Sequence, residues 1–120
     1  MKPLAFTSKI DSLLSDLDQA EPVSFDLGTP ELPDLDAVHQ LVAMGTEIVP
    51  HMLERLQGDG PKQRTAYIVQ VLNQLGDVRA LAALLDLRAR YQQRETKDEW
   101  DYAVIGQCNL AIEQLQKQAR

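Results

Sequence analysis

Two stretches of this chain, LVAMGTEIVPHMLERL (Leu41–Leu56) and LNQLGDVRALAALLDL (Leu72–Leu87), are degenerate copies of one another, 31 residues apart. Apolar residues and a glycine recur at equivalent positions: Val38 with Val69, Leu41 with Leu72, Gly45 with Gly76, Leu53 with Leu84 and Leu56 with Leu87. A repeat of this length, with apolar residues at helical spacing, is typical of stacked helical hairpins. Such hairpins bury their apolar faces only against neighbours, so the repeat predicts an all-α solenoid.

The apolar spacing predicts six helices. The first covers residues 8–19, and the others are expected near residues 36–45, 46–57, 62–75, 77–93 and 97–118. Gly45 and Gly76 are each placed to end a helix in a left-handed conformation, and Asp77 is placed to cap the next helix. The expected apolar set of that helix is Val78, Leu81, Leu84, Leu85 and Tyr91.

A proline-rich segment, residues 20–34, separates the first helix from the repeats. Its three prolines and one glycine exclude a regular helix, so we expect an extended connection. Val23, Phe25 and Leu27 alternate there, which is consistent with a short strand. The chain is therefore expected to comprise an N-terminal helix and extension (1–35) and a helical repeat domain (36–120).

Charge is distributed unevenly along the 120 residues. Residues 1–54 carry ten acids against two lysines, a net of −8, whereas residues 55–120 carry a net of +2. This acidic balance disfavours nucleic acid as a partner, because a phosphate-binding surface needs a concentrated basic face. Two interpretations remain: the acidic region is solvated or lies against the later arginines, or it presents an acidic face to a basic partner.

Neither membrane insertion nor export is indicated. There is no 18-residue apolar run, the start lacks a signal-length apolar core, and the lone Cys108 suits a reducing compartment. We therefore expect a cytoplasmic protein that makes no contact with a membrane.

The segments that begin at Gly45 (GTEIVPHMLERL) and Gly76 (GDVRALAALL) resemble HEAT repeats, especially the short bacterial type of phycobilin lyases and bacterial scaffold proteins. Met44-Gly45 and Leu75-Gly76 match the Leu-Gly end of the family's outer helix. The resemblance covers about residues 36–115. The turn and inner-helix positions of the family are matched by Asp77, Ala80, Leu84 and Leu85. In the third helix pair, Asn109-Leu110-Ala111 stands in place of the Leu-Gly ending, so the chain is expected to end on a capping helix.

One helix face could hold a metal ion, because Glu47, His51 and Glu54 share it and His39 lies on the preceding helix. Such spacings are common on solvated faces, so we expect no metal there. Cys108 lies in an apolar stripe and is expected to be a buried structural thiol. Asp98, Glu99 and Asp101 are interpreted as carboxylates that stabilise the start of the last helix. Trp100 is interpreted as an anchor that packs between helices.

A basic series accompanies Tyr91 in the later helices: Arg79, Arg88, Arg90, Arg94 and Lys97. Arginine and tyrosine are enriched at interface hot spots, so these residues are candidates for partner binding together with Glu47, His51 and Glu54. Arg88 and Arg90 are expected on different sides of their helix. The alternative is a set of cations that stabilise a solvated helix end.

The sequence thus predicts a non-catalytic adaptor, without a cofactor, that binds another protein in a groove lined by residues 46–57 and 77–93. The resemblance leaves one alternative, a bilin lyase-like or chaperone-like enzyme subunit. A second alternative is a self-assembling module such as a homodimer, because short solenoids expose apolar ends.

Overall fold

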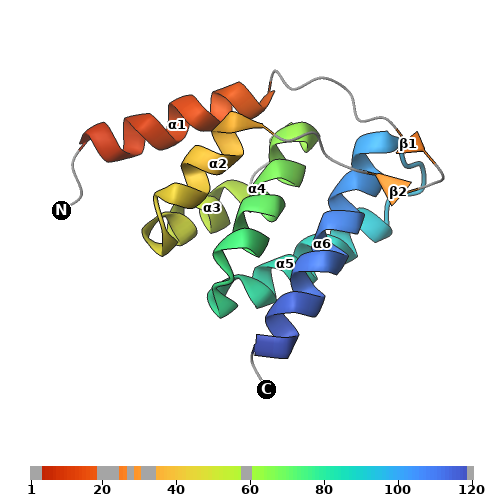
Figure 1. Cartoon of the computed structure of the whole chain (residues 1–120). Coiled ribbons are helices and arrows are strands. Elements are labelled where there is room, and N and C mark those ends of the chain that lie inside the picture. The colour runs from red at the N-terminus through yellow and green to blue at the C-terminus, as the bar shows by residue number, and fades with distance from the viewer. Residues whose placement is uncertain (1–3, 19–24, 27–28, 31–34, 58–60, 119–120) are drawn as a thin grey trace.

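The structure is a computed structural model that describes residues 4–18, 25–26, 29–30, 35–57 and 61–118. Within these ranges the chain has the predicted all-α class and the predicted six helices (Figure 1). The helices are α1 (Leu4–Asp18), α2 (Asp36–Ala43), α3 (Val49–Leu56), α4 (Lys62–Leu75), α5 (Leu81–Gln92) and α6 (Glu99–Gln118).

Two helical hairpins follow one another with the same order of elements. A single 3-10 turn, η1 (Thr46–Ile48), joins α2 to α3, and η2 (Val78–Ala80) joins α4 to α5. The 31-residue repeat in the sequence is therefore a repeat of helix, glycine, 3-10 turn and helix.

The two repeat glycines have positive φ angles but different conformations. Gly76 ends α4 in the left-handed region (φ 66°, ψ 30°), as expected, and Asp77 caps the next turn by accepting a hydrogen bond from the Arg79 N–H. Gly45 differs from the expectation, because its ψ of −173° is extended rather than left-handed helical. Its carbonyl oxygen accepts from the Ile48 N–H, so Gly45 already begins η1.

The helices lie in two layers, with α2, α4 and α6 in one and α3 and α5 in the other (Figure 1). Helices α4 and α6 run parallel, since Lys62 pairs with Asp101 near their starts and Gly76 approaches Gln118 near their ends. Helices α3 and α5 also run parallel, because Arg79 before α5 binds the Thr46 carbonyl oxygen before α3, and Arg90 near the end of α5 binds the Leu56 carbonyl oxygen at the end of α3.

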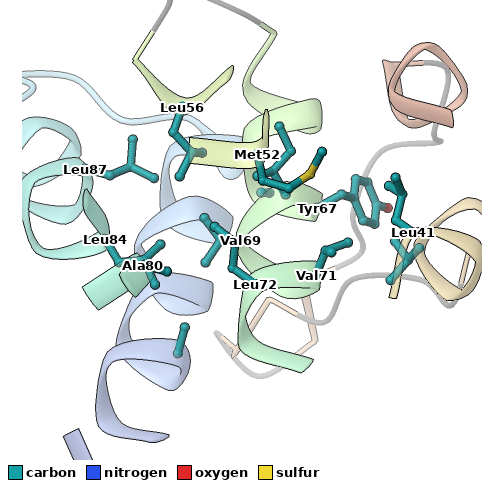
Figure 2. Close-up of a cluster of buried hydrophobic side chains, with 14 of the residues drawn as sticks. Leu41, Met52, Leu56, Tyr67, Val69, Val71, Leu72, Ala80, Leu84 and Leu87 are labelled. Carbon is teal, nitrogen blue, oxygen red and sulfur yellow. The ribbon is translucent and has the colours of Figure 1, made fainter. Parts of the chain in front are cut away.

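The core lies between these layers. The repeat partners Val38 and Val69, Leu41 and Leu72, and Leu56 and Leu87 are all buried, and Figure 2 shows many of these side chains around α4. Helix α4 is buried over much of its circumference, because it has neighbouring helices on several sides. The buried residues of α4 are Thr65, Ala66, Tyr67, Ile68, Val69, Val71 and Leu72.

Helix α1 packs against α2 and α4 and starts at Leu4, earlier than predicted. It has one apolar stripe, which is buried in the same core as the repeats; the members are Ile10, Leu13, Leu14 and Leu17. Two ion pairs fasten its acidic side to later arginines, Asp11 to Arg55 and Asp18 to Arg64. Part of the acidic N-terminal charge therefore lies against arginines of the same chain.

The connection after α1 contains a short antiparallel ladder. Strand β1 (Phe25–Asp26) pairs with β2 (Thr29–Pro30), and β2 lies against α6 (Figure 1). The ladder agrees with the expected extended character at Phe25, whereas Val23 and Leu27 lie outside the described residues.

Candidate functional site

An exposed apolar stripe runs along α5 and the 3-10 turn η2 that precedes it. Val78 is 49% and Leu85 is 36% exposed, and Ala82 and Ala89 are exposed as well. At about 100° per residue, Ala82, Leu85 and Ala89 share one narrow sector of α5, and Val78 of η2 precedes Ala82 by four residues. The expected apolar set for this helix is therefore only partly correct, because Leu84, Leu87 and Tyr91 already fill the side that faces the core.

Arginines on either side of the stripe show which way it faces. The Arg79 guanidinium donates to the Thr46 carbonyl oxygen (3.3 Å) and that of Arg90 to the Leu56 carbonyl oxygen (3.1 Å), so both point towards α3. Arg88 points the other way and donates to Asn109 Oδ1 on α6 (3.0 Å). The stripe lies between these two sides and faces away from the core.

Helix α3 and the 3-10 turn η1 that precedes it present polar side chains at the equivalent positions. Glu47, His51 and Glu54 precede Val78, Ala82 and Leu85 by 31 residues each. Glu47 and Glu54 are exposed and His51 is half-buried. Since α3 and α5 lie side by side in parallel, these residues form one surface with the stripe. We call this the α3–α5 face; it comprises Glu47, His51, Glu54, Val78, Ala82, Leu85 and Ala89.

The basic series does not gather into one patch. Arg79 is paired with Asp77 (2.7 Å) and Arg90 with Asp86 (3.2 Å), and both arginines border the α3–α5 face. Hydrogen bonds from Arg79 hold the pKa of the Asp77 carboxyl below its usual value. Arg88 lies towards α6, as its position opposite Arg90 predicts.

Arg94 and Tyr91 lie apart from this face. The Arg94 guanidinium covers the Tyr91 ring at 4.5 Å from its centroid, and Tyr91 is only 6% exposed. Arg94 also contacts the Asp101 carboxylate, at 3.1 Å. Tyr91 therefore belongs to the core and not to the surface on which the sequence placed it, whereas the Arg94 side chain pairs with Asp101 and stays 43% exposed.

The acids at the start of α6 form a reciprocal cap. Asp98 accepts a hydrogen bond from the Asp101 N–H, and Asp101 accepts one from the Asp98 N–H, both at 2.9 Å. The Asp101 side chain is almost fully buried and also pairs with Lys62 (3.0 Å). The Lys62 hydrogen bond is the main reason why the pKa of Asp98 is lowered, and the Asp98 hydrogen bond raises the pKa of Lys62.

This cluster ties α4, the loop before α6 and α6 itself together, and it matches the capping-box pattern in which each end residue bonds the other's backbone. The structural interpretation of these acids from the sequence rested on the helix dipole alone. The Asp-x-x-Asp spacing of Asp98 and Asp101 is the sequence feature from which the reciprocal cap could have been predicted.

Next to the cluster lies an open hollow of about 670 Å³, lined by Lys97, Asp98, Glu99, Trp100 and Tyr102. Trp100 is half-buried and packs on the Tyr67 ring, 6.1 Å between centroids, which fits its expected role as an anchor between helices. Lys97 donates to the Arg94 carbonyl oxygen and Asp98 belongs to the cap. Two polar side chains of this hollow, Lys97 and Asp98, thus serve the helix start.

The remaining candidates are placed as follows. Cys108 is fully buried, and burial raises the pKa of its thiol to about 12. Among the described residues, no three His, Cys, Asp or Glu side chains gather as metal ligands would, Glu47, His51 and Glu54 included. In the same part of the chain, no helix is long and apolar enough to cross a membrane.

Comparison of the chain with protein-family models, with curated proteins and with solved structures found no match.

Proposed function

We propose that this protein is a non-catalytic interaction module, a short HEAT-like α-α solenoid that binds a partner protein on the α3–α5 face. The exposed apolar stripe of α5 is the observation that carries this proposal. Leu84 and Leu87 belong to the hydrophobic core, whereas Val78 and Leu85 are exposed and lie outside the core cluster. Isolated exposed apolar residues are ordinary, but an aligned row on one helix is typical of a binding surface.

Two observations support the solenoid architecture: the two hairpins have the same order of elements, and α3 and α5 are parallel. In such a stack, the second helix of each hairpin contributes to one continuous surface. The residues that differ between the two copies on that surface are Glu47, His51 and Glu54 against Val78, Ala82 and Leu85. The surface therefore combines a polar half with an apolar half.

The size of the stripe suggests a modest affinity. Stable interfaces bury about 800 Å² on each partner, far more than two large and two small apolar side chains provide. A partner must therefore cover the polar residues of α3 as well, and the complex is expected to be transient.

A capture experiment tests the proposal. The chain is immobilised, a partner is captured from lysate, and the amount captured is compared between matched variants. Leu85→Glu places a charge in the stripe, whereas Leu110→Glu makes the same change at a residue of α6 that is 57% exposed and lies off the face. We expect Leu85→Glu to lose the captured protein and Leu110→Glu to retain it. Equal capture by the two variants, with both folded, would contradict the proposal.

A further inference from the structure

The exposed stripe of η2 and α5 has a spacing that reads the same in both directions. Its members, Val78, Ala82, Leu85 and Ala89, are separated by four, three and four residues, and large side chains alternate with alanines. The midpoint of the stripe falls between positions 83 and 84. A two-fold rotation about this midpoint, with the axis perpendicular to the helix, therefore brings the stripe of a second copy onto this one in the antiparallel direction.

In this antiparallel pairing every large side chain of the stripe meets a small one. Val78 of one copy comes opposite Ala89 of the other, and Ala82 comes opposite Leu85. Large and small residues that alternate across facing positions let two helices interlock at a short distance. A parallel two-fold pairing would instead set Leu85 against Leu85 and alanine against alanine, which leaves gaps at the alanines. The stripe is thus complementary to an inverted copy of itself.

The charged residues beside the stripe are complementary in the same arrangement. Arg79 lies on the α3 side, where its guanidinium binds the Thr46 carbonyl oxygen. Asp86 lies on the same side, since it pairs with Arg90, which also points towards α3. The rotation keeps the α3 sides of both copies together, so Arg79 of one copy lies about 3 Å along the helix axis from the level of Asp86 in the other.

Both of these side chains remain accessible to a second copy. Arg79 is 55% and Asp86 is 73% exposed, although each already has a partner in its own chain. By symmetry the Arg79–Asp86 contact between copies occurs twice, once towards each end of the stripe. Opposite charges at these border positions favour the antiparallel direction and fix its register.

We propose that the partner on the α3–α5 face is a second copy of this chain, with the two α5 helices paired antiparallel about a two-fold axis. Each stripe covers the other, and an Arg79–Asp86 pair between copies lies towards each end of the contact. Helix α3 of one copy faces α3 of the other, so polar residues of α3 are covered as well. This inference rests on the proposed function and names its partner.

The affinity of this contact is expected to be low. Two large and two small apolar side chains provide far less area than a stable dimer interface buries, and exposed ion pairs add little strength. The net charge of −6 also opposes the approach of two copies. We therefore expect a reversible dimer with a Kd on the order of 100 µM, measured near 0.15 M salt, where repulsion beyond about 8 Å is screened.

Sedimentation equilibrium of the full chain, from about 10 µM to about 1 mM, tests for this dimer. Leu85→Glu places a charge opposite Ala82 of the other copy and should weaken the dimer by about tenfold or more. Leu110→Glu makes the same change at an exposed position of α6 and should leave the dimer unchanged. Circular dichroism of both variants establishes that they are folded.

An exchange of charges tests the antiparallel register. Arg79→Glu brings two acids together and Asp86→Arg brings two arginines together, so each variant alone should dimerise about fivefold more weakly. An equimolar mixture of these variants restores opposite charges at both ends of the contact, so mixed dimers should form as tightly as those of the unchanged chain. Glu113→Lys changes the charge at an exposed position of α6 and should have little effect.

Three results would each overturn the inference: a chain that stays monomeric up to about 1 mM, a dimer that Leu85→Glu leaves intact, or a mixture that associates no better than its two components. These results leave the proposed function intact if Leu85→Glu still abolishes capture from lysate, because the face then binds a different protein. The function itself fails if Leu85→Glu changes neither that capture nor any dimer.

Discussion

Glu54 on α3 and Leu85 on α5 occupy the same position in two successive helices, 31 residues apart, and both side chains are exposed. Their neighbours Leu53 and Leu84 also occupy equivalent positions and belong to the core or pack against it. The repeat thus preserves the inward side of these helices, while the outward side changes from acidic to apolar. That change is what distinguishes the α3–α5 face from a generic solvated surface.

The buried carboxylate of Asp101 is expected to be a main support of the fold. It accepts hydrogen bonds from Lys62, Arg94 and the Asp98 N–H, so Asp101→Ala would remove a cap and leave Lys62 without its buried partner. We predict a loss of about 3 kcal/mol in the free energy of unfolding, measured by urea denaturation. Glu99→Ala, at an exposed acid in the same turn, should cost under about 0.5 kcal/mol. Similar losses for the two variants would show that the cluster does not stabilise the fold.

The two repeat glycines should respond differently to alanine. Gly45 has φ 82° and ψ −173°, a region that is almost restricted to glycine, so Gly45→Ala is predicted to cost about 2 kcal/mol although nothing crowds the new Cβ. Gly76 is left-handed helical, and Gly76→Ala should cost about 1 kcal/mol, since the atoms nearest to the new Cβ belong to the flexible end of the Gln118 side chain. Thermal or urea unfolding of the two variants provides the comparison. A larger loss at Gly76 would contradict the assigned backbone conformations.

Stability should decline at both ends of the pH scale. The pKa values of Asp77 and Asp98 are lowered in the folded chain, so their contributions are present above the usual value of 3.8 and are lost as the pH falls below it. The pKa of the Cys108 thiol is raised from 9.0 to about 12, so folding opposes its ionisation and stability falls as the pH rises through that range. Urea midpoints measured against pH should show a plateau between these limits. Cys108→Ala should reduce the alkaline slope; an unchanged slope would mean that the thiol is not buried.

The pairing of Asp18 with Arg64 should hold the end of α1 on α4. Arg64 Nε lies 2.9 Å from Asp18 Oδ1, and both side chains are about three-quarters covered. A double-mutant cycle of Asp18→Asn and Arg64→Gln is predicted to give a coupling of about 1 kcal/mol in the free energy of unfolding, because two-point arginine–carboxylate pairs exceed ordinary surface pairs. Additive effects would show that the pair does not contribute.

Much of the fold could be predicted from apolar spacing, because helical periodicity reports which side of a helix is buried. The boundaries of α4, the caps at Gly76 and Asp77, and the stripe of α1 from Ile10 to Leu17 follow directly from it. Spacing alone could not tell that Val78 and Leu85 are exposed, since no sequence rule states how many sides of a helix its neighbours cover. The contacts of Arg94 with Asp101 and of Arg79 with Thr46 were equally inaccessible, because they depend on how separate helices are placed.

Site-specific photo-crosslinking tests the central claim, that the α3–α5 face binds a partner, most directly. A photoreactive amino acid is placed at position 85 in one variant and at position 110 in another, and each chain is irradiated in cells. We predict a crosslinked partner from position 85, and no such product from position 110. Crosslinks that form equally from the two positions, or only from position 110, would contradict the account.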